Sequence, residues 1–345
     1  MHKVLFIDDG IEFDSKLVRQ KAFGGAEIAF VSLVEALAKI NFKVTVYNNC
    51  KHNGLINKVF WKKLGSDIKN EDFDILIVNR GDKYLNFRPE CKKRFFWIHN
   101  PANYLLKFRY LSKLLFNKFT IIFSSQYHYD TYPNWAPAKK IIIPYGLDEF
   151  FFKKKKIKRS DLKPIAIFTS NPLRKLDWLL DLWENRIFPN VPSAKLNIFS
   201  GHSTYGRFGE KHSLKINSIL LKAKKLKKKG VILNKPIKRS KLFSKIAKSR
   251  LFLYGSSINE TFCMSAAESQ ILCTPGVVMN SGCLGERIIN QKTGYVCDNE
   301  EEFIQRTIEL LVDNKQWIKM HTYLLKHNHH YSWKEIAQKW KKILK

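Results

Sequence analysis

The sequence predicts an α/β protein with two Rossmann-like domains, each built on a parallel sheet with helices on both faces. Its 345 residues are enough for two domains. Short apolar runs alternate with stretches of helical periodicity along the whole chain, which is typical of strand–helix–strand units. The alternation starts again after a segment rich in Pro, Gly and Lys. Hydrophobic residues make up 45% and aromatic residues 13% of the chain, which excludes a disordered protein.

Residues 1–146 form the first predicted domain. Each of its strands is a compact run of β-branched and aromatic residues: Val4–Ile7, Lys43–Tyr47, Asp74–Val78, Phe95–Ile98, Thr120–Phe123 and Lys140–Ile143. Between the first two, Ala26–Ile40 carries apolar residues at helical spacing. Buried runs separated by helices indicate a parallel sheet.

A basic linker at 147–163, which includes the run FFKKKKIKR, separates this domain from the second, at 164–313. The second domain repeats the pattern, with strands expected at Ile165–Thr169, Leu196–Phe199, Val231–Leu233, Leu251–Tyr254 and Gly276–Met279. Residues 314–345 are expected to be helical, with tryptophans on apolar stripes. Folds of this kind bind ligands at the carboxyl ends of their strands, so we expect a cleft between the two domains.

The chain is strongly basic, with 61 Lys and Arg against 30 Asp and Glu, a formal net charge of +31. Such a field attracts nucleotide phosphates, anionic lipids and nucleic acid alike, so the charge alone does not select a function. No apolar run has the ~18 residues of a membrane-spanning helix, and the first strand is too short for a signal peptide. The six cysteines form no C-x-x-C pair, which favours reduced, buried thiols in a cytoplasmic protein.

Two loops of the first domain carry candidate ligand-binding residues. Gly24 and Gly25 precede a helix, where backbone N–H groups can approach an anion, although a glycine pair is more often a simple turn. His99 follows a strand directly, at the edge of the sheet where ligands bind. A single histidine usually has a structural role, and its position at the strand end makes ligand contact or proton transfer the alternative.

The corresponding loop of the second domain contains Arg174 and Lys175. A guanidinium presents a planar fork to phosphate, and the ammonium adds a compact charge beside it. Two cations at the start of a helix oppose the helix dipole unless an anion joins them, which favours a phosphate site over two surface charges.

The most specific pattern is an E-x7-E pair, Glu260 and Glu268, at a strand-to-helix turn. We expect the helix to begin near Thr261, which would put Glu260 at its mouth and Glu268 about two turns along it. Carboxylates accept paired sugar hydroxyls, and the N–H groups near Cys263 and Met264 would suit a phosphate. The alternative is a capping box between Ser257 and Glu260 with one surface glutamate.

Together these features resemble the GT-B-fold glycosyltransferases, specifically the family-four-like group of retaining, nucleotide-sugar-dependent enzymes. The resemblance covers nearly the whole chain: Gly24–Glu27, His99, Pro144–Asp148, Arg174, the E-x7-E pair, Ser281–Glu286 and Tyr331–Trp333. It implies that the helices of 314–345 return to the first domain. The sequence departs from the family at Ser170, where an arginine is frequent, and at Cys273-Thr274-Pro275, where Gly-x-Pro is usual.

By this resemblance, Glu268 would hold the ribose hydroxyls of the donor and Glu260 the hydroxyls of the transferred sugar. Arg174, with Lys175, would neutralise the diphosphate, helped by backbone amides of Gly25 and Met264, as preorganised charges do for a leaving group. His99 would contact the donor sugar. The resemblance implies no metal and no cofactor beyond the nucleotide-sugar, and Asp72-Phe73-Asp74 is expected to be a turn rather than a metal site.

The acceptor side is less specific. The loop Asp8–Phe23 is a candidate for shaping a second-substrate pocket. Residues 105–119 (LLKFRYLSKLLFNKF) combine large apolar residues with four cations and no acid, as basic amphipathic helices on anionic membranes do. An ordinary helix packed on the sheet is the alternative. We therefore expect a cytoplasmic enzyme and leave peripheral contact with the inner face of the membrane open.

The sequence thus predicts a retaining hexosyltransferase that moves a sugar from a nucleotide-sugar to a saccharide or lipid-linked saccharide acceptor. A nucleotide-sugar epimerase or a phosphorylase of the same fold is the first alternative. A basic nucleic-acid-binding protein is the second, and nucleic acid is not an expected partner because the chain has no recognised nucleic-acid motif.

Overall fold

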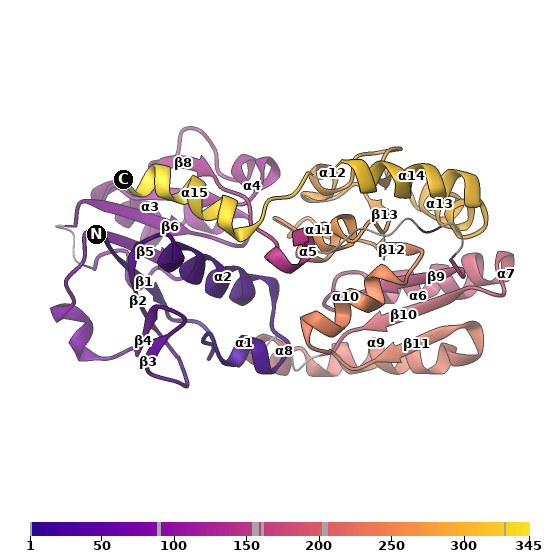
Figure 1. Ribbon diagram of the computed structural model, residues 1–345, viewed down its shortest axis with the longest axis horizontal. Helices are drawn as coiled ribbons and strands as arrows, with labels where there is room; N and C mark the ends of the chain where they lie inside the picture. The colour runs from indigo at the N-terminus through magenta and orange to yellow at the C-terminus, as the bar shows by residue number, and fades with distance from the viewer. Residues whose placement is uncertain (1, 88–90, 154–158, 160–161, 202–205, 328) are drawn as a thin grey trace. The chain divides into compact units, whose positions relative to one another are not determined.

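The computed structural model describes residues 2–87, 91–153, 159, 162–201, 206–327 and 329–345 (Figure 1). The chain forms two compact units. The first contains Met1–Glu149 and Tyr331–Lys345, and the second contains Phe150–His330. Most of the basic run FFKKKKIKR lies outside the described residues.

The first unit is built on an eight-stranded sheet in the order β3-β4-β2-β1-β5-β6-β7-β8, parallel except for the pair β3 and β4. Its strands are β1 (Lys3–Asp8), β2 (Lys43–Asn48), β3 (Gly54–Ile56), β4 (Val59–Lys63), β5 (Ile75–Asn79), β6 (Lys93–Trp97), β7 (Thr120–Phe123) and β8 (Lys139–Ile142). The six strands expected from the sequence are confirmed, with ends shifted by one or two residues.

The hairpin of β3 and β4 was not predicted. Its two-residue turn, Asn57-Lys58, has φ of +52° and +68°, the left-handed pair that matches the twist of a hairpin. Asn-Gly is the usual sequence for such a turn, and a lysine in its second position gives no comparable signal. The short edge strand Gly54–Ile56 is also largely exposed, so it has no alternating apolar pattern.

In the described part of this unit, five α-helices and two 3-10 turns accompany the sheet: α1 (Leu17–Gln20), α2 (Gly25–Lys39), α3 (Phe108–Phe116), α4 (Gln126–Asp130), α15 (Trp333–Leu344), Ser66–Asn70 and Ala102–Leu106. The expected helix Ala26–Ile40 is α2, whose apolar face is fully buried. Figure 1 shows α15, in yellow, beside α2, and the two helices are in contact.

The backbone at Gly146 and the start of the last helix, α15, approach each other closely within the first unit. The Cβ of any residue in place of Gly146 would lie 2.7 Å from the Cα of Trp333, so only glycine fits there. Ser332 begins α15 with a capping box to Glu335, and the Trp340 ring packs edge-on against that of Trp97. The predicted tail 314–345 is therefore divided: α14 (Asn314–Lys326) lies in the second unit, in contact with α13 (Glu300–Val312).

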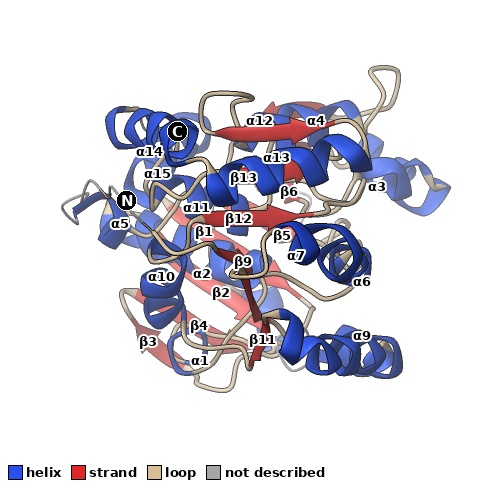
Figure 2. Ribbon diagram, turned by 90° about the vertical axis from the view of Figure 1, so that its right-hand side faces the viewer, coloured by secondary structure: helices blue, strands red, loops and turns tan. Residues whose placement is uncertain are grey.

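The second unit contains a six-stranded, fully parallel sheet in the order β11-β10-β9-β12-β13-β14. Its strands are β9 (Ile165–Phe168), β10 (Lys195–Phe199), β11 (Val231–Asn234), β12 (Leu251–Tyr254), β13 (Gly276–Met279) and β14 (Gly294–Cys297). The five expected strands are confirmed, and the edge strand β14 was not predicted. Figure 2 shows strands of this sheet as red arrows between helices.

Besides α13 and α14, the described α-helices of this unit are α6 (Leu176–Leu182), α7 (Phe188–Asn190), α8 (Gly206–Lys211), α9 (Ser213–Lys225), α10 (Arg239–Ala247), α11 (Met264–Ile271) and α12 (Leu284–Arg287). A π-helical turn (Trp183–Ile187) joins α6 to α7, and a 3-10 turn (Leu226–Lys229) follows α9. The short helix α5 (Glu149–Lys153) lies where the chain passes from the first unit to the second. The lysine-rich segment 221–230 ends at Gly230, which has φ +73°, as expected for a helix terminus. No helix in the described part of the chain is long and apolar enough to span a membrane.

Candidate active site

In the first unit, three polar side chains follow neighbouring parallel strands. Asp8 ends β1, Asn79 ends β5, and His99 lies two residues after β6. They form a hydrogen-bonded chain: the Asn79 amide donates to Asp8, and its oxygen lies 2.7 Å from Nε2 of His99. The sequence predicted the place of His99, and the same strand-end rule could have found Asp8 and Asn79.

The partners of His99 assign its protonation state. Asn79 Oδ1 accepts from Nε2–H, and the Tyr145 hydroxyl donates to Nδ1. Burial, reinforced by the charge of Arg80, holds the pKa of His99 well below its ordinary value. The imidazole is therefore neutral at pH 7, with both nitrogens engaged.

Arg80 is the charged centre of this cluster, and sequence reasoning missed it. Its Nε lies 3.1 Å from Asp8 Oδ2, and its Nη1 donates to Glu27 Oε1 at 2.8 Å. The residue has φ +66°, a conformation that side-chain-bearing residues rarely adopt. Burial lowers the pKa of the guanidinium, but Asp8 and Glu27 raise it above its ordinary value. Burial also raises the pKa of Asp8, against the opposing effect of Arg80.

The glycine pair lies where the sequence placed it, at the start of α2. Gly24 is the N-cap with extended backbone (φ −65°, ψ 160°), and Gly25 is the first helical residue. The acidic residue of this turn, Glu27, is buried and holds Arg80. The loop therefore connects to the His99 cluster through one ion pair.

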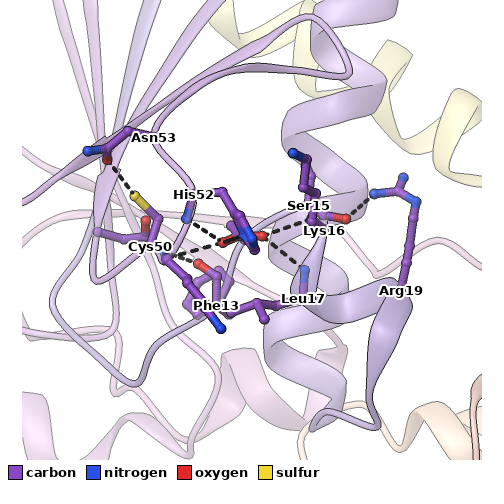
Figure 3. Close-up of polar contacts among 11 residues, drawn as sticks. Phe13, Ser15, Lys16, Leu17, Arg19, Cys50, His52 and Asn53 are labelled. Atoms are coloured by element: carbon purple, nitrogen blue, oxygen red, sulfur yellow. Dashed lines mark hydrogen bonds and ion pairs between the residues drawn. The ribbon is translucent and has the colours of Figure 1, made fainter.

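The loop Asp8–Phe23 is organised around the buried carboxylate of Asp14. Figure 3 shows polar contacts of this loop, with Lys16, Leu17 and His52 labelled. One oxygen of Asp14 accepts the backbone N–H groups of Lys16 and Leu17 at 2.8 and 2.9 Å. The other accepts from the backbone N–H of His52 at 3.0 Å and lies 2.9 Å from its Nδ1. Burial raises the pKa of Asp14, but these hydrogen bonds outweigh it and the net shift is downward.

A second carboxylate fastens the same loop to α2. Glu35 is buried and accepts from the Ser15 hydroxyl at 2.6 Å and from the guanidinium of Arg19 at 2.6 and 3.0 Å. Two acids thus give this long loop a defined conformation beside the strand ends.

In the second unit, Arg174 and Lys175 lie in the loop between β9 and α6. The Asn171 side chain accepts from the Leu173 N–H at 2.9 Å, and its carbonyl accepts from the Arg174 N–H at 2.9 Å, which shapes the loop. Lys175 is the N-cap of α6 in the left-handed region (φ +57°), with its ammonium over the ring of Trp178.

The cation of Arg174 faces an acid of this unit. Its Nε lies 3.7 Å from Oε2 of Glu260, and the Tyr254 hydroxyl donates to the same oxygen at 2.5 Å. Arg174 follows β9 and Tyr254 ends β12, the neighbouring strand, so the parallel register brings them to one edge. Tyr254 was not predicted as a site residue, although its place at a strand end could have indicated it.

The expected position of Glu260 was inaccurate. The helix α11 begins at Met264, so Glu260 lies in the loop before it and Glu268 is one turn along the helix rather than two. No capping box with Ser257 forms, because the Glu260 carboxylate bonds to Tyr254. Instead, the Glu260 carbonyl accepts from the Cys283 N–H at 3.0 Å. Gly282, at φ +62°, is required there, since a Cβ would lie 2.6 Å from that carbonyl oxygen.

Glu268 is buried in α11 and forms an ion pair with Arg239, the first residue of α10. Sequence reasoning missed Arg239, and nothing in its surroundings in the sequence distinguishes it from the many other cations nearby. Glu268 is therefore a buried carboxylate with a cationic partner. It does not lie on an exposed face of the helix.

Cys263 and Met264 begin α11. Cys263 is the N-cap with φ +58°, and its thiol is buried. Burial and the nearby charge of Glu260 raise the pKa of this thiol to about 12, so it is neutral at pH 7. The Asp72-Phe73-Asp74 segment lies at the other edge of the first sheet, before β5, where both acids contact Lys3. Among the described residues, no three His, Cys, Asp or Glu side chains are grouped to hold a metal ion.

The predicted residues therefore fall into two groups, one in each unit. Gly24, Gly25 and His99 lie in the first. Arg174, Lys175, Glu260, Cys263, Met264 and Glu268 lie around β9, β12 and α11 of the second.

Comparison with known proteins supports a common fold. Residues 208–340 match the family model described as glycosyl transferases group 1. None of the curated protein sequences compared with the chain matches it. Sucrose-phosphate synthase from Thermosynechococcus elongatus is 12% identical, with a TM-score of 0.74 over 99% of this chain and 98% of that one.

Two further solved structures are similar over nearly their whole length. HepE from Anabaena, in complex with UDP-glucose, is 14% identical with a TM-score of 0.74, covering 100% of this chain and 99% of that one. A glycosyltransferase from Rickettsia africae ESF-5 is 14% identical with a TM-score of 0.69, covering 99% and 97%. At these identities the likeness shows the fold, which is the two-domain GT-B arrangement of parallel sheets.

Proposed function

We propose that this chain transfers a sugar from a nucleotide-sugar donor to a saccharide or lipid-linked saccharide acceptor, with retention of anomeric configuration. The match of residues 208–340 to the family model of the group 1 glycosyl transferases supports this proposal. The observation that carries the proposal is the grouping of Arg174, Tyr254 and Glu260 at the ends of two adjacent strands, with Glu268 in the helix that follows.

Arg174 and Glu260 have complementary parts in this proposal. The guanidinium neutralises the diphosphate as the glycosidic bond breaks, and Glu260 accepts hydroxyls of the transferred sugar. In the structure the two side chains are 3.7 Å apart, so each charge is compensated. A bound diphosphate would compete with Glu260 for Arg174 and leave the carboxylate to the sugar and Tyr254. Lys175 and the backbone amide of Met264 assist on the phosphate side.

Glu268 holds the ribose in the same proposal. Its ion pair with Arg239 gives this buried carboxylate a partner of opposite charge, and a buried charge without such a partner would be strongly destabilising. Arg239 thus acts through Glu268 as a positioning residue.

His99 contacts the donor sugar, with the backbone amide of Gly25 on the phosphate side. Because both imidazole nitrogens have partners and the ring is neutral, His99 serves as a polar contact rather than a shuttle that changes charge during turnover. Departure of the diphosphate needs no metal or cofactor in this scheme, since the cations and N–H donors stabilise the charge that develops on it.

The base of the donor is proposed from the relatives. HepE was solved with UDP and with UDP-glucose, and TarM of S. aureus with UDP and saccharide ligands. We therefore take a uridine nucleotide as the first candidate. On the acceptor side, α3 exposes Phe108 (84%), Leu115 (59%) and Phe116 (79%) among cations, which supports peripheral contact of 105–119 with a membrane that carries a lipid-linked acceptor.

The test is thermal unfolding with UDP, GDP, ADP, CMP and a short duplex DNA at two salt concentrations. Ligand at about 100 times its dissociation constant adds roughly 2.7 kcal/mol of stability. We expect UDP to stabilise the wild type, and 2′-deoxy-UDP to stabilise it less. Glu268→Gln should abolish this difference between ribose and deoxyribose, whereas Glu301→Gln, on an exposed carboxylate of α13, should preserve it.

If only DNA stabilises the protein, at low salt and equally in the wild type and Glu268→Gln, the donor site is refuted and the nucleic-acid alternative is favoured. Incubation with UDP-glucose without acceptor separates the epimerase, which alters the donor alone. Proton NMR of the first product formed from an acceptor reads its anomeric configuration, and an inverted product would contradict retention.

A further inference from the structure

A pocket of about 800 Å³ opens in the first unit, far from the strand ends described above. It is lined by the first residues of β6, β7 and β8, the end of α3 and Ile343 of α15. Because these strands are parallel, their first residues lie at one edge of the sheet and His99 lies beyond the opposite one. The length of β6 separates the two edges by about 15 Å.

The pocket is strongly cationic. Five of its lining residues are Lys or Arg, namely Lys92, Lys93, Arg94, Lys118 and Lys139. No acid is found among the lining residues that the structure describes. A concave surface lined by charge of one sign concentrates the opposite charge.

Among the described residues, four of these five cations have no acidic partner. Lys92 pairs with Asp74 at 3.1 Å, outside the lining. Lys93 donates to the carbonyl oxygen of Ile343 at 3.1 Å and Arg94 donates to that of Asn117, so both retain a full charge.

Lys118 and Lys139 are exposed at the rim. Within the described ranges, the ammonium of neither has a hydrogen bond or an ion pair. Lys118 follows α3 with φ +49°, in a left-handed turn. Two lysines thus face solvent beside Lys93 and Arg94, whose positions are fixed by carbonyl oxygens, which suits a ligand with phosphate oxygens.

The pocket also has an apolar side. Phe95, Leu114, Phe119 and Ile141 line it, and Leu114 and Phe119 are buried. Leu115 lines it too and is 59% exposed, next to Phe116, which is 79% exposed. Cations beside exposed large apolar side chains are complementary to a phosphate that carries an acyl chain, and less so to an inorganic anion or a nucleic acid.

We propose that this pocket binds the phosphate headgroup of an anionic membrane lipid, with Lys118 and Lys139 contacting the phosphate and Leu115 and Phe116 entering the boundary of the acyl chains. The inference deepens the membrane contact of the proposed function by naming the lipid class and the residues that bind it. None of the residues that line the pocket is among those proposed to contact the donor.

The experiment is co-sedimentation of the full chain with vesicles at fixed ionic strength. One vesicle type is pure phosphatidylcholine, and the other is phosphatidylcholine and phosphatidylglycerol in a three-to-one mixture. The wild type should bind only the anionic vesicles. Lys118→Ala with Lys139→Ala should weaken binding about 30-fold, from roughly fivefold for each lysine near an anionic surface.

Two matched controls distinguish the pocket from the general charge. Lys39→Ala with Lys51→Ala removes the same charge from exposed sites elsewhere in the unit and should change binding less than about twofold, because neither lysine lines the pocket. Leu115→Ser should weaken binding several-fold, whereas Leu221→Ser, at a 54% exposed leucine of α9, should not.

Equal losses in the two lysine pairs would overturn the proposal, because binding would then follow net charge. A second outcome would also overturn the proposal. In it, the wild type does not bind vesicles, and inorganic phosphate stabilises the wild type but not Lys118→Ala/Lys139→Ala, which would assign the pocket to a free anion. UDP stabilisation measured on the same variants keeps the two proposals separate: it should persist in all of them, and its loss in the wild type would count against the donor site alone.

Discussion

The hydroxyl of Tyr254 donates a 2.5 Å hydrogen bond to Oε2 of Glu260, the carboxylate proposed to hold the transferred sugar. Burial and the charge of Glu260 raise the pKa of Tyr254 well above its ordinary value, so this hydroxyl keeps its proton at every pH the enzyme meets. A fixed donor on one oxygen leaves the other oxygen of Glu260 to a ligand. The variants below test this arrangement and its surroundings.

Tyr254→Phe should lower the turnover number roughly ten- to a hundredfold, because a hydrogen bond to a charged group contributes about 1.5–3 kcal/mol. Glu260→Gln should lower it by about 10²–10³, as loss of a preorganised polar contact to the reacting group does. Both should retain UDP binding in thermal unfolding. Loss of UDP binding in Tyr254→Phe would show that the tyrosine supports the fold of the site rather than the carboxylate.

Gly282→Ala should displace the Glu260 loop. The left-handed backbone (φ +62°) costs a residue with Cβ about 1–3 kcal/mol, and the added atom would lie 2.6 Å from the Glu260 carbonyl oxygen. We expect a lower melting temperature and a lower turnover number. Gly285→Ala is the matched control, since nothing lies within 4 Å of its Cβ, and it should be neutral or slightly stabilising. Equal effects of the two substitutions in urea unfolding would contradict this reading of the loop.

Arg239→Met should destabilise the second unit by about 2–3 kcal/mol in urea unfolding. It leaves the buried carboxylate of Glu268 without its cation, although some exposure of Arg239 moderates the cost. Adding Glu268→Gln should restore much of the stability, because a neutral amide has a smaller desolvation cost. A double variant no more stable than Arg239→Met would mean that Arg239 contributes through packing alone.

Arg80→Met should destabilise the first unit by about 3 kcal/mol or more, since it leaves the buried Asp8 and Glu27 carboxylates without their shared cation. Arg109→Met is the control: Arg109 is exposed and lies 3.8 Å from Asp82, so its loss should leave the stability of the unit nearly unchanged. Similar losses for both arginines would show that the Arg80 pairs do not stabilise the unit.

His128 should make the first unit sensitive to acid. Its Nε2–H donates to the Asn100 carbonyl at 2.7 Å, and its Nδ1 accepts from the Ser124 hydroxyl at 3.0 Å. Burial lowers the pKa of His128 to about 4, against about 6.5 in the unfolded chain. The unfolded state therefore binds the proton first as the pH falls, so stability present above about 6.5 decreases toward pH 4.

The expected slope from His128 alone is about 1.4 kcal/mol per pH unit within that window. In urea unfolding of His128→Gln the slope should be smaller by that amount, while other buried histidines keep the remainder. An unchanged slope would mean that His128 does not titrate between the folded and unfolded states as its burial indicates.

How far the sequence determined this fold is clearest at its strands. Runs such as Thr120–Phe123 and Leu251–Tyr254 are apolar throughout, and a strand buried on both faces requires that composition whatever surrounds it. The hairpin at 54–63 was missed because its edge strand is largely exposed. Neither that strand nor the turn has an apolar pattern in the sequence. His99 and Glu260 were found because residues that follow such strands reach the ligand-binding edge of a parallel sheet.

The partners of those residues were decided only by the tertiary structure. Arg80 is 72 residues from Asp8 and 53 from Glu27, and its sequence context, Arg80-Gly81-Asp82, is that of an ordinary turn. Arg239 is one of many cations near its place in the chain, and only the packing of α10 against α11 brings it to Glu268. Local patterns determine which segments are buried, because burial depends on composition. Which charge meets which depends on contacts between segments distant in the chain, and these contacts form only when the sheets and helices pack.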